Sequence, residues 1–390
     1  MNDNQIKAAV IAEVDSRREE LAAISKEIHD NPETGMHEVK ASALLTRFLE
    51  KNGFQVERGI CQLPTAFRAS YGTGKPAIAI LAEYDALPEI GHACGHNIIA
   101  TSAVGAAVAA KAAVDSLGGT VLVVGTPAEE LYGGKIIMAE RGAFEGLDAA
   151  MMVHPGTCDC AITWALGCLT LYVKFFGKAA HAAAHPEEGI NALDAMLLAF
   201  NSINALRQHI KSTARIHGII THGGEAANVI PAYTEGEFLI RDEDDAYLDQ
   251  LKERVVDCFK GAALATGARL EYRWGDTRFA TMWSNTTLAG IYRDNMESLG
   301  RTVLLEEPKN NLGSTDTGNV SHIVPTIHPY VALNVEDGAH TIQFAEAAVS
   351  ETGTKAVIDS AKAMAMTITD LLASKNLLNK VKEEFKEKHG

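Results

Sequence analysis

The sequence predicts an α/β protein made of two domains, one of which is inserted into the other. Three observations lead to this prediction. First, apolar runs at residues 77–85 and 120–127 flank an apolar stretch at 98–114, the pattern of a strand, a buried helix and a second strand. Second, between residues 167 and 280 the order becomes strand, helix, strand, strand, helix, strand, a ferredoxin-like α+β pattern. Third, 390 residues exceed what one hydrophobic core usually organises.

The chain begins with helices. Leu21, Ile24 and Ile28 stand in helical register. A second helical run covers residues 39–51 and stops before Gly53, a residue type that commonly follows a helix. We therefore expect two helices within the first ~50 residues.

The next elements build the core of the first domain. A strand, a crossover helix and a parallel strand between residues 77 and 127 predict a mixed, mostly parallel sheet with helices on both faces. Ligands of such sheets collect at the carboxyl ends of the strands. Asp85, Glu129 and His154 all fall at predicted strand ends, so we expect the functional site at this edge of the sheet.

The second domain interrupts the first. Its expected elements are a strand at 169–177, a helix at 190–208, strands at 214–223 and 232–240, a helix at 244–266 and a strand at 268–274. The α/β pattern then resumes with a helix from Leu288, a strand at 326–333 and a long final helix from about residue 354. We therefore predict one domain from residues 1–166 and 281–390 and an inserted domain from residues 167–280.

Composition argues against several classes of protein. The net charge is −15, and no Lys/Arg patch with interleaved aromatic residues is present, so nucleic acid is not an expected partner. No run of 18 uncharged apolar residues is present, so no membrane association is expected. The first residues lack the pattern of a signal peptide, and the six cysteines show no disulfide framework. We therefore expect a cytoplasmic protein.

The segment from His92 to His96 concentrates groups that bind metals. It holds two imidazoles and the Cys94 thiol within five residues, and Gly95 frees the backbone to turn these side chains toward one point. Because Cys94 directly precedes a predicted helix, the helix N-terminus should favour its thiolate. The alternative is that Cys94 is a small buried apolar residue and that the two histidines cap a loop.

Two adjacent carboxylates, Glu129 and Glu130, follow the apolar strand at 120–127. Metal-dependent hydrolysis uses such a pair, because one carboxylate holds the cation and the other passes a proton from the attacking water to the leaving nitrogen. The alternative is an exposed acidic corner between a strand and a loop, which is a common feature of protein surfaces.

Further candidate ligands are His154, which ends a strand, and His340, which lies on a loop after the strand at 326–333. Neither histidine would indicate a site alone. Together with the thiol, imidazole and carboxylate described above, they complete a mixed nitrogen, oxygen and sulfur donor set. Such a set suits zinc, with manganese or cobalt as alternatives.

The motifs that carry these residues resemble peptidase family M20, in particular its amidohydrolase branch (subfamily D). In chain order they read LAEYDALP, HACGHN, TPAEE, MMVHP, GKAAHAAAHPEEGINAL, GGEAANVIP, GSTDTGNVSHIVP and DGAHT. The resemblance runs nearly end to end. Asn97, GSTDTGNVS and IHPY are most similar to the group that holds the dipeptidases of the branch and p-aminobenzoyl-glutamate hydrolase.

The resemblance implies a role for each candidate residue. The implied ligands of two divalent metal ions are Cys94, which bridges them, and His96, Glu130, His154 and His340. Glu129 is then the general acid/base, and Asp85 orients a ligand by hydrogen bonding. Many members of the branch have aspartate where this chain has Asn97, so the sequence departs from the pattern there.

The resemblance also implies that the inserted domain is a lid that carries the interface of a homodimer. His217 is expected to approach the substrate carbonyl, and the alternative is that it packs between strands. The implied substrate-binding residues are Asn228, Gly313, Ser314 and Thr315. The roles of Glu83 and His181 stay open.

The implied function is hydrolysis of an amide bond in a small substrate with a free carboxylate: a dipeptide, an N-acyl amino acid or p-aminobenzoyl-glutamate. In this mechanism two cations activate a shared water, Glu129 moves its proton, and a lid histidine stabilises the oxyanion. Two alternatives stay open. One is a non-catalytic relative that binds small amides, and the other is a hydrolase with Cys94 as nucleophile and His96 as base.

Overall fold

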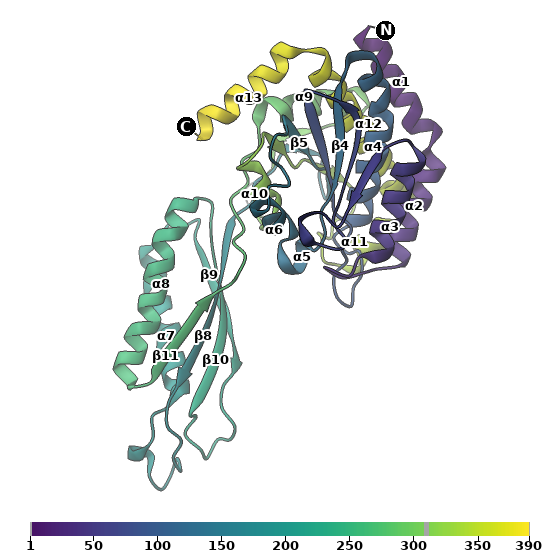
Figure 1. Cartoon of the computed structure of the whole chain (residues 1–390). Coiled ribbons are helices and arrows are strands. Elements are labelled where there is room, and N and C mark those ends of the chain that lie inside the picture. Colours follow the sequence, from purple (N-terminus) through teal and green to yellow (C-terminus); the bar gives the residue numbers. More distant parts are fainter. Residues whose placement is uncertain (1, 308–311, 390) are drawn as a thin grey trace. The chain divides into compact units, whose positions relative to one another are not determined.

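The computed structural model describes residues 2–307 and 312–389 and divides the chain into two compact units (Figure 1). Unit 1 consists of Met1–Trp164 and Met282–Gly390, and unit 2 consists of Ala165–Thr281. Unit 1 is a mixed α/β domain and unit 2 is an α+β domain inserted between its two segments, which confirms the fold class expected from the sequence.

Unit 1 begins with three helices, α1 (Asp3–Ser16), α2 (Arg18–Asp30) and α3 (Val39–Lys51). The expectation of two helices was wrong because the helical segment before Asn31 breaks at Arg17. The Arg17 guanidinium binds one carboxylate on each side of the break, at 2.6 Å from Glu13 and at 2.9 Å from Glu20. Both helices bury a narrow apolar stripe against the core.

The central sheet of unit 1 has the strand order β1-β2-β4-β3-β5-β13. The strands are β1 (Gln55–Arg58), β2 (Phe67–Thr73), β3 (Ala77–Ala82), β4 (Gly119–Gly125), β5 (Ala149–Met151) and β13 (Thr326–Ile327). The four strands from β4 to β13 pair in parallel, whereas β1 and β2 add an antiparallel edge. This edge was not expected, because β1 alternates poorly between buried and exposed residues.

The crossover helix α4 (His96–Leu117) connects β3 to β4 and packs against α12 (Glu351–Ala373). By length and composition α4 alone among the described helices is apolar enough to cross a membrane, but 89% of its most apolar window is buried inside the unit. Gly105 allows the close packing, because a Cβ there would lie 3.0 Å from Leu21 Cδ1 and 3.4 Å from Ala361 Cβ. α4 is therefore the central core helix of unit 1.

Short helices cover the other face of the sheet. They include α6 (Gly134–Glu140) and α10 (Thr317–Ser321), whose Met138 and Val320 share a core cluster with Leu81 and Val124 of the sheet. The remaining helices of unit 1 are α5 (Glu129–Tyr132), α9 (Thr286–Ser298), α11 (Ile342–Ala347), α13 (Lys375–His389) and the 3-10 turn η1 (Ile60–Gln62). The sheet is thus covered on both faces, as the sequence indicated.

A small second sheet in unit 1 has the order β12-β7-β14-β6. Its strands are β6 (His154–Gly156), β7 (Cys160–Ile162), β12 (Leu304–Glu306) and β14 (Tyr330–Ala332). The single strand expected at 326–333 is therefore two strands in two sheets, because Pro329 lacks the N–H that would continue the ladder. Tyr330 pairs with His154 in this second sheet, which fixes His154 at the sheet edge.

Unit 2 contains β8 (Gly167–Phe176), α7 (Ala192–Leu206), β9 (Arg215–His222), β10 (Tyr233–Asp242), α8 (Asp245–Thr266) and β11 (Arg269–Trp274), with two short 3-10 turns, η2 (Pro186–Glu188) and η3 (Arg207–His209). The antiparallel sheet has the order β11-β8-β10-β9, and both long helices pack on it (Figure 1). This arrangement is the expected ferredoxin-like pattern.

Candidate metal centre

Strand ends and helix starts of unit 1 bring the predicted residues together. β3 ends at Ala82, just before Glu83 and Asp85, while β4 ends shortly before the Glu129–Glu130 pair that opens α5. His96 begins α4, and His154 begins β6. These elements place their polar residues at the carboxyl edge of the central sheet, where α/β folds bind ligands.

The five predicted metal ligands gather into two overlapping groups. In one group, ligand atoms of Cys94, His96 and His154 all lie within 4.8 Å of one another, and in the other, those of Cys94, Glu130 and His340 do so. The shortest contact is 3.4 Å, between Cys94 Sγ and His154 Nε2. Because Cys94 belongs to both groups, it stands where a bridging ligand would.

Hydrogen bonds fix the orientation of two imidazoles. His96 Nδ1 lies 3.0 Å from Asp85 Oδ1, and His154 Nδ1 lies 2.7 Å from the Pro155 carbonyl oxygen. Each acceptor selects the tautomer with the proton on Nδ1, so Nε2 keeps its lone pair. Asp85 Oδ2 also accepts the backbone N–H of Glu130 at 3.1 Å. A single carboxylate thus orients two of the predicted ligands, as the resemblance implied for Asp85.

The arrangement fits a metal ion. Within the described part of the chain, His96 Nε2 and Glu130 Oε1 are buried atoms without a hydrogen-bond partner. They lie 3.8 Å apart, and His340 Nε2 lies 3.5 Å from the same carboxylate oxygen. Two ligands bound at about 2.0–2.2 Å to one tetrahedral cation are separated by roughly 3.3–3.6 Å. The donor spacing therefore suits a shared cation better than direct hydrogen bonds.

Cys94 needs a cation to become a thiolate. Burial raises the pKa of its thiol far above the usual range, and this effect outweighs the neighbouring His96 imidazole. The expectation that the helix N-terminus would favour the thiolate was wrong, because the side chain is almost fully buried before α4 begins. Cation binding would release the thiol proton, since a metal ligand must be deprotonated.

Glu129 has the surroundings of a proton carrier. Burial raises its pKa well above the usual value, and the carboxylates of Glu83, Asp316 and Glu130 raise it further. A carboxyl group that holds its proton near neutral pH can serve as an acid as well as a base. Glu129 is therefore chemically distinct from Glu130, whose oxygen faces the imidazoles.

A buried glutamate that sequence reasoning missed shapes the turn before Glu129. Ala128 adopts the left-handed conformation, with φ 62°, and its N–H donates to Glu38 Oε1 at 2.8 Å. Glu38 Oε2 accepts the hydroxyl of Thr65 at 2.9 Å. Burial raises the pKa of Glu38 to about 7. Glu38 precedes a predicted helix, and nothing in its local sequence separates it from an ordinary helix cap.

Lys135 and Asp316 were also missed as members of the centre. Lys135 is buried and its Nζ binds Glu83 and Asp316, and Glu83, Glu129 and Asp316 offer oxygen atoms within 4.8 Å of one another. A lysine in the run GGKIIMA could have signalled this, because α6 buries the face that carries it.

The turn predicted to bind substrate lies beside this cluster. Gly313 is exposed, Ser314 and Thr315 are partly exposed, and Asp316 is fully buried against Lys135. The Thr315 hydroxyl accepts the N–H of Thr317 at 3.3 Å and so starts α10. The structure thus brings one end of the turn to Glu129, while substrate binding by Gly313, Ser314 and Thr315 stays a prediction.

Three predicted residues belong to unit 2. His217 is an exposed residue of β9 opposite Leu239, and Asn228 is exposed with its carbonyl accepting the N–H of Ala182 at 3.0 Å. His181 Nδ1 accepts the N–H groups of Ala183 and Ala184, so it closes a local turn. The substrate contacts implied for His217 and Asn228 stay predictions.

Asn97 has a packing role. Its side-chain N–H₂ donates to Ser25 Oγ at 2.9 Å and to the Ala348 carbonyl at 3.3 Å. It therefore ties α4 to α2 and to the end of α11. An aspartate could not donate these bonds, so the departure from the aspartate of many branch members has a structural consequence.

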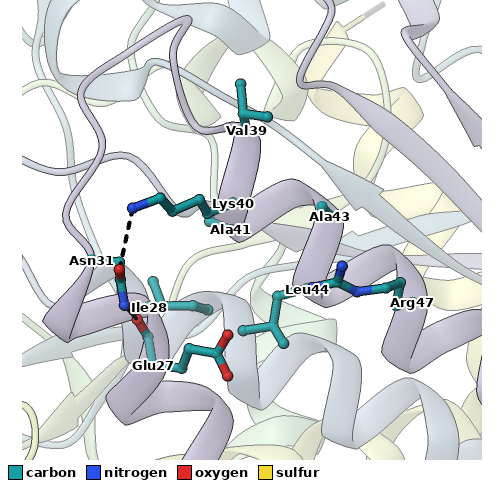
Figure 2. A pocket seen from close by; sticks show the side chains of 9 residues that line it. All are labelled: Glu27, Ile28, Asn31, Val39, Lys40, Ala41, Ala43, Leu44 and Arg47. Carbon is teal, nitrogen blue, oxygen red and sulfur yellow. Dashed lines mark hydrogen bonds between the residues drawn. The ribbon is translucent and has the colours of Figure 1, made fainter.

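A separate pocket of about 280 Å³ lies between α2 and α3 (Figure 2). It is lined by Glu27, Ile28, Asn31, Val39, Lys40, Ala41, Ala43, Leu44 and Arg47. Lys40 Nζ donates to Asn31 Oδ1 at 3.3 Å across one side of it. None of the predicted site residues lines this pocket, so it is distinct from the metal centre.

Known proteins share both the sequence and the fold. Residues 165–266 match the family model described as the M20 peptidase dimerisation domain. Xaa-Arg dipeptidase of Mus musculus is 41% identical over 397 residues, which cover 98% of this chain and 92% of that protein. One of the subunits of p-aminobenzoyl-glutamate hydrolase from Escherichia coli (strain K12) is 36% identical over 308 residues, covering 74% and 64% of the two chains.

A solved structure agrees in fold. A dinuclear metal binding peptidase of the M20 family from Bacillus subtilis superposes with a TM-score of 0.71 at 20% identity, covering 92% of this chain and 99% of that one. The sequence identity to the dipeptidase extends over nearly the whole length of both chains. The chain therefore belongs to peptidase family M20 and is a hydrolase.

Proposed function

We propose that this protein is a metal-dependent dipeptidase that cleaves the amide bond of small substrates carrying a free carboxylate. The observation that carries this proposal is the buried convergence of thiol, imidazole and carboxylate groups on two points, with His96 Nε2 and Glu130 Oε1 unpartnered among the described residues. Glu129 stands beside these ligands with a raised pKa. This combination supports hydrolysis more than binding alone.

Dipeptides with a C-terminal arginine are the first proposed substrates, because the relative at 41% identity is named Xaa-Arg dipeptidase. The second candidate is p-aminobenzoyl-glutamate, because a relative at 36% identity is named for its hydrolysis. N-acyl amino acids complete the proposed range. All three classes present a carboxylate next to the amide that is cleaved.

Two divalent cations are proposed at the centre, zinc in the first place and manganese or cobalt as alternatives, because the donors include one thiol and several imidazoles. The proposed ligands are Cys94, His96, Glu130, His154 and His340. When bound, the cations supply a Lewis acid that polarises the carbonyl and makes water more acidic.

The residues of the chain supply the remaining steps. Asp85 holds His96 and Glu130 in position. Glu129 takes the proton of the attacking water and passes it to the leaving nitrogen, which its raised pKa favours. His217 is proposed to donate a hydrogen bond to the developing oxyanion, and Asn228 with the turn from Gly313 to Thr315 to hold the substrate.

A homodimer formed through unit 2 is proposed as the working assembly. The match of residues 165–266 to a dimerisation domain supports it. The exposed apolar residues Leu197, Leu198 and Ile219 on α7 and β9 are the proposed contact surface, because such residues are rarely left in water as a group.

The proposal is tested by measuring amine release from a panel of Xaa-Arg and other dipeptides, N-acyl amino acids and p-aminobenzoyl-glutamate. Each reaction is run with zinc, manganese or cobalt and again with a chelator. We expect chelator-sensitive cleavage, strongest for Xaa-Arg dipeptides. The Glu129→Gln variant serves as the control for contaminating peptidases, because it should bind metal without cleaving.

Other outcomes favour the alternatives. Cleavage that persists in chelator but stops when cysteine is alkylated would support a Cys94 nucleophile. Metal binding without cleavage of any substrate in the panel would favour a non-catalytic amide-binding relative. Preferred cleavage of p-aminobenzoyl-glutamate would exchange the first and second substrate proposals.

A further inference from the structure

A fully buried lysine lies beside the proposed catalytic glutamate. Lys135 is in the first turn of α6, and its side chain is 0% exposed. Its Nζ donates to Glu83 Oε1 and, at 2.9 Å, to Asp316 Oδ1. Its backbone N–H donates to Asp316 Oδ2 at 2.8 Å. The ammonium therefore joins the residue after β3 to the turn before α10.

The lysine belongs to a cluster of three carboxylates. One oxygen from each of Glu83, Glu129 and Asp316 lies within 4.8 Å of the others. Three carboxylates at this spacing repel one another strongly in a buried place. Oxygen donors in such a group are also the ligands that Mn²⁺ and Mg²⁺ prefer. The Lys135 ammonium bonds to two of the three and so supplies the positive charge that the cluster needs.

Lys135 also sets the direction of Glu83. One oxygen of Glu83 binds the ammonium, and the other, Oε2, lies 3.5 Å from His96 Nε2. That imidazole nitrogen is the atom His96 presents to a proposed metal ion. Without the lysine, both oxygens of Glu83 would be free to turn toward a cation.

We propose that Lys135 is a built-in cation and a positioning residue of the centre. It fills the space among Glu83, Glu129 and Asp316 and keeps a further divalent ion out of that space. The proposal rests on the proposed function, because Glu129 is assigned to proton transfer, yet its test counts bound ions and does not depend on turnover. In Lys135→Met the alkyl chain stays while the charge is lost, which leaves three carboxylates free for a cation.

The test is a titration of metal-free protein with Mn²⁺, in which the free ion is measured by electron paramagnetic resonance. We expect Lys135→Met to bind about one more Mn²⁺ per chain than the wild type. Combining it with Glu83→Gln removes one carboxylate charge, so the additional ion should bind at least ~10-fold more weakly. The control is Lys7→Met, since Lys7 is a partly buried lysine that pairs with Asp370 elsewhere.

Equal numbers of Mn²⁺ in the wild type and Lys135→Met would overturn the proposal, and so would a double variant that keeps the additional ion at full affinity. If Lys135→Met is insoluble, the double variant decides. A soluble double variant with the wild-type number of ions supports the charge role, and an insoluble one overturns it. A wild type that binds no Mn²⁺ contradicts the proposed metal centre, whereas a gain in Lys135→Met still supports the role of Lys135.

Discussion

Adjacent glutamates carry different tasks at the scale of single residues. Glu130 accepts orientation from Asp85 through its backbone and faces the imidazoles with one oxygen. Glu129 lies instead in the carboxylate cluster with Glu83 and Asp316. Adjacent residues can do both tasks because α5 begins there, and successive side chains of a helix point in different directions.

This division predicts the effect of Glu129→Gln. An amide cannot carry the proton, so we expect kcat to fall by at least ~100-fold while the metal content stays that of the wild type. Cys94→Ser is the contrasting variant, and it should lower metal occupancy because it changes the shared ligand. Activity assays and metal analysis of both variants check the prediction. Full activity in Glu129→Gln would contradict its assignment.

Glu38 predicts a pH dependence of stability. Burial raises its pKa from 4.5 to about 7 in the folded protein, which therefore binds a proton that the unfolded chain has released over this pH range. The free energy of unfolding should then fall as the pH rises through this window, by up to ~3 kcal/mol from this residue. Its contribution is most favourable below pH 4.5, where both states are protonated.

The Glu38→Gln variant tests this dependence. Glutamine does not titrate, so the difference in unfolding free energy between pH 5 and pH 8 should shrink by about 2–3 kcal/mol. Urea denaturation with chelator present measures it without a contribution from metal binding. Glu297→Gln, at an exposed position of α9, is the control. An unchanged pH dependence in Glu38→Gln would show that Glu38 is not the responsible group.

At the scale of elements, the junction between α5 and α6 sets the position of both glutamates. Gly134 lies at this junction, and a Cβ there would stand 1.8 Å from the Pro127 carbonyl oxygen. Because that atom belongs to the backbone, the chain itself must shift to accept any side chain. The turn that holds Glu129 and Glu130 lies between these two points.

We therefore expect Gly134→Ala to lower the free energy of unfolding by ~3 kcal/mol and to reduce kcat, because the backbone clash displaces the glutamates. The matched control is Gly290→Ala in α9, where no atom lies within 4 Å of the added Cβ. That change should stabilise the helix by ~0.5–1 kcal/mol and leave kcat unchanged. Thermal unfolding and steady-state kinetics of the two variants check the expectation. Equal behaviour of the two would argue against a constrained junction.

The limits of sequence reasoning are also visible at this scale. The crossover of β3, α4 and β4 and the inserted ferredoxin-like pattern were predictable, because their apolar periodicity is local. The role of Lys135 was not, since its partner Asp316 lies 181 residues away and no local pattern marks a buried lysine. β1 was missed because most of its residues are exposed. Long-range ion pairs and edge strands leave little trace in a single sequence.

For the whole molecule, the proposed dimer makes the two edges of the unit 2 sheet unequal. The edge strand β11 carries Arg269, Glu271 and Arg273, charges of the kind that prevent strands from pairing between molecules. The other edge strand, β9, is uncharged between its ends apart from its histidine, and its Ile219 is 64% exposed. The β9 edge is therefore the one open to a second copy.

Ile219→Lys should consequently shift the dimer toward monomer. A lysine buried in an apolar contact loses hydration without gaining a partner, so we expect at least a ~100-fold weaker dimer. The control is Leu264→Lys, which changes an 87% exposed leucine near the end of α8, a helix that packs beside β11. Sedimentation velocity over a range of protein concentrations measures both. If Ile219→Lys remains as dimeric as the wild type while Leu264→Lys dissociates, the contact surface lies on the α8 side instead.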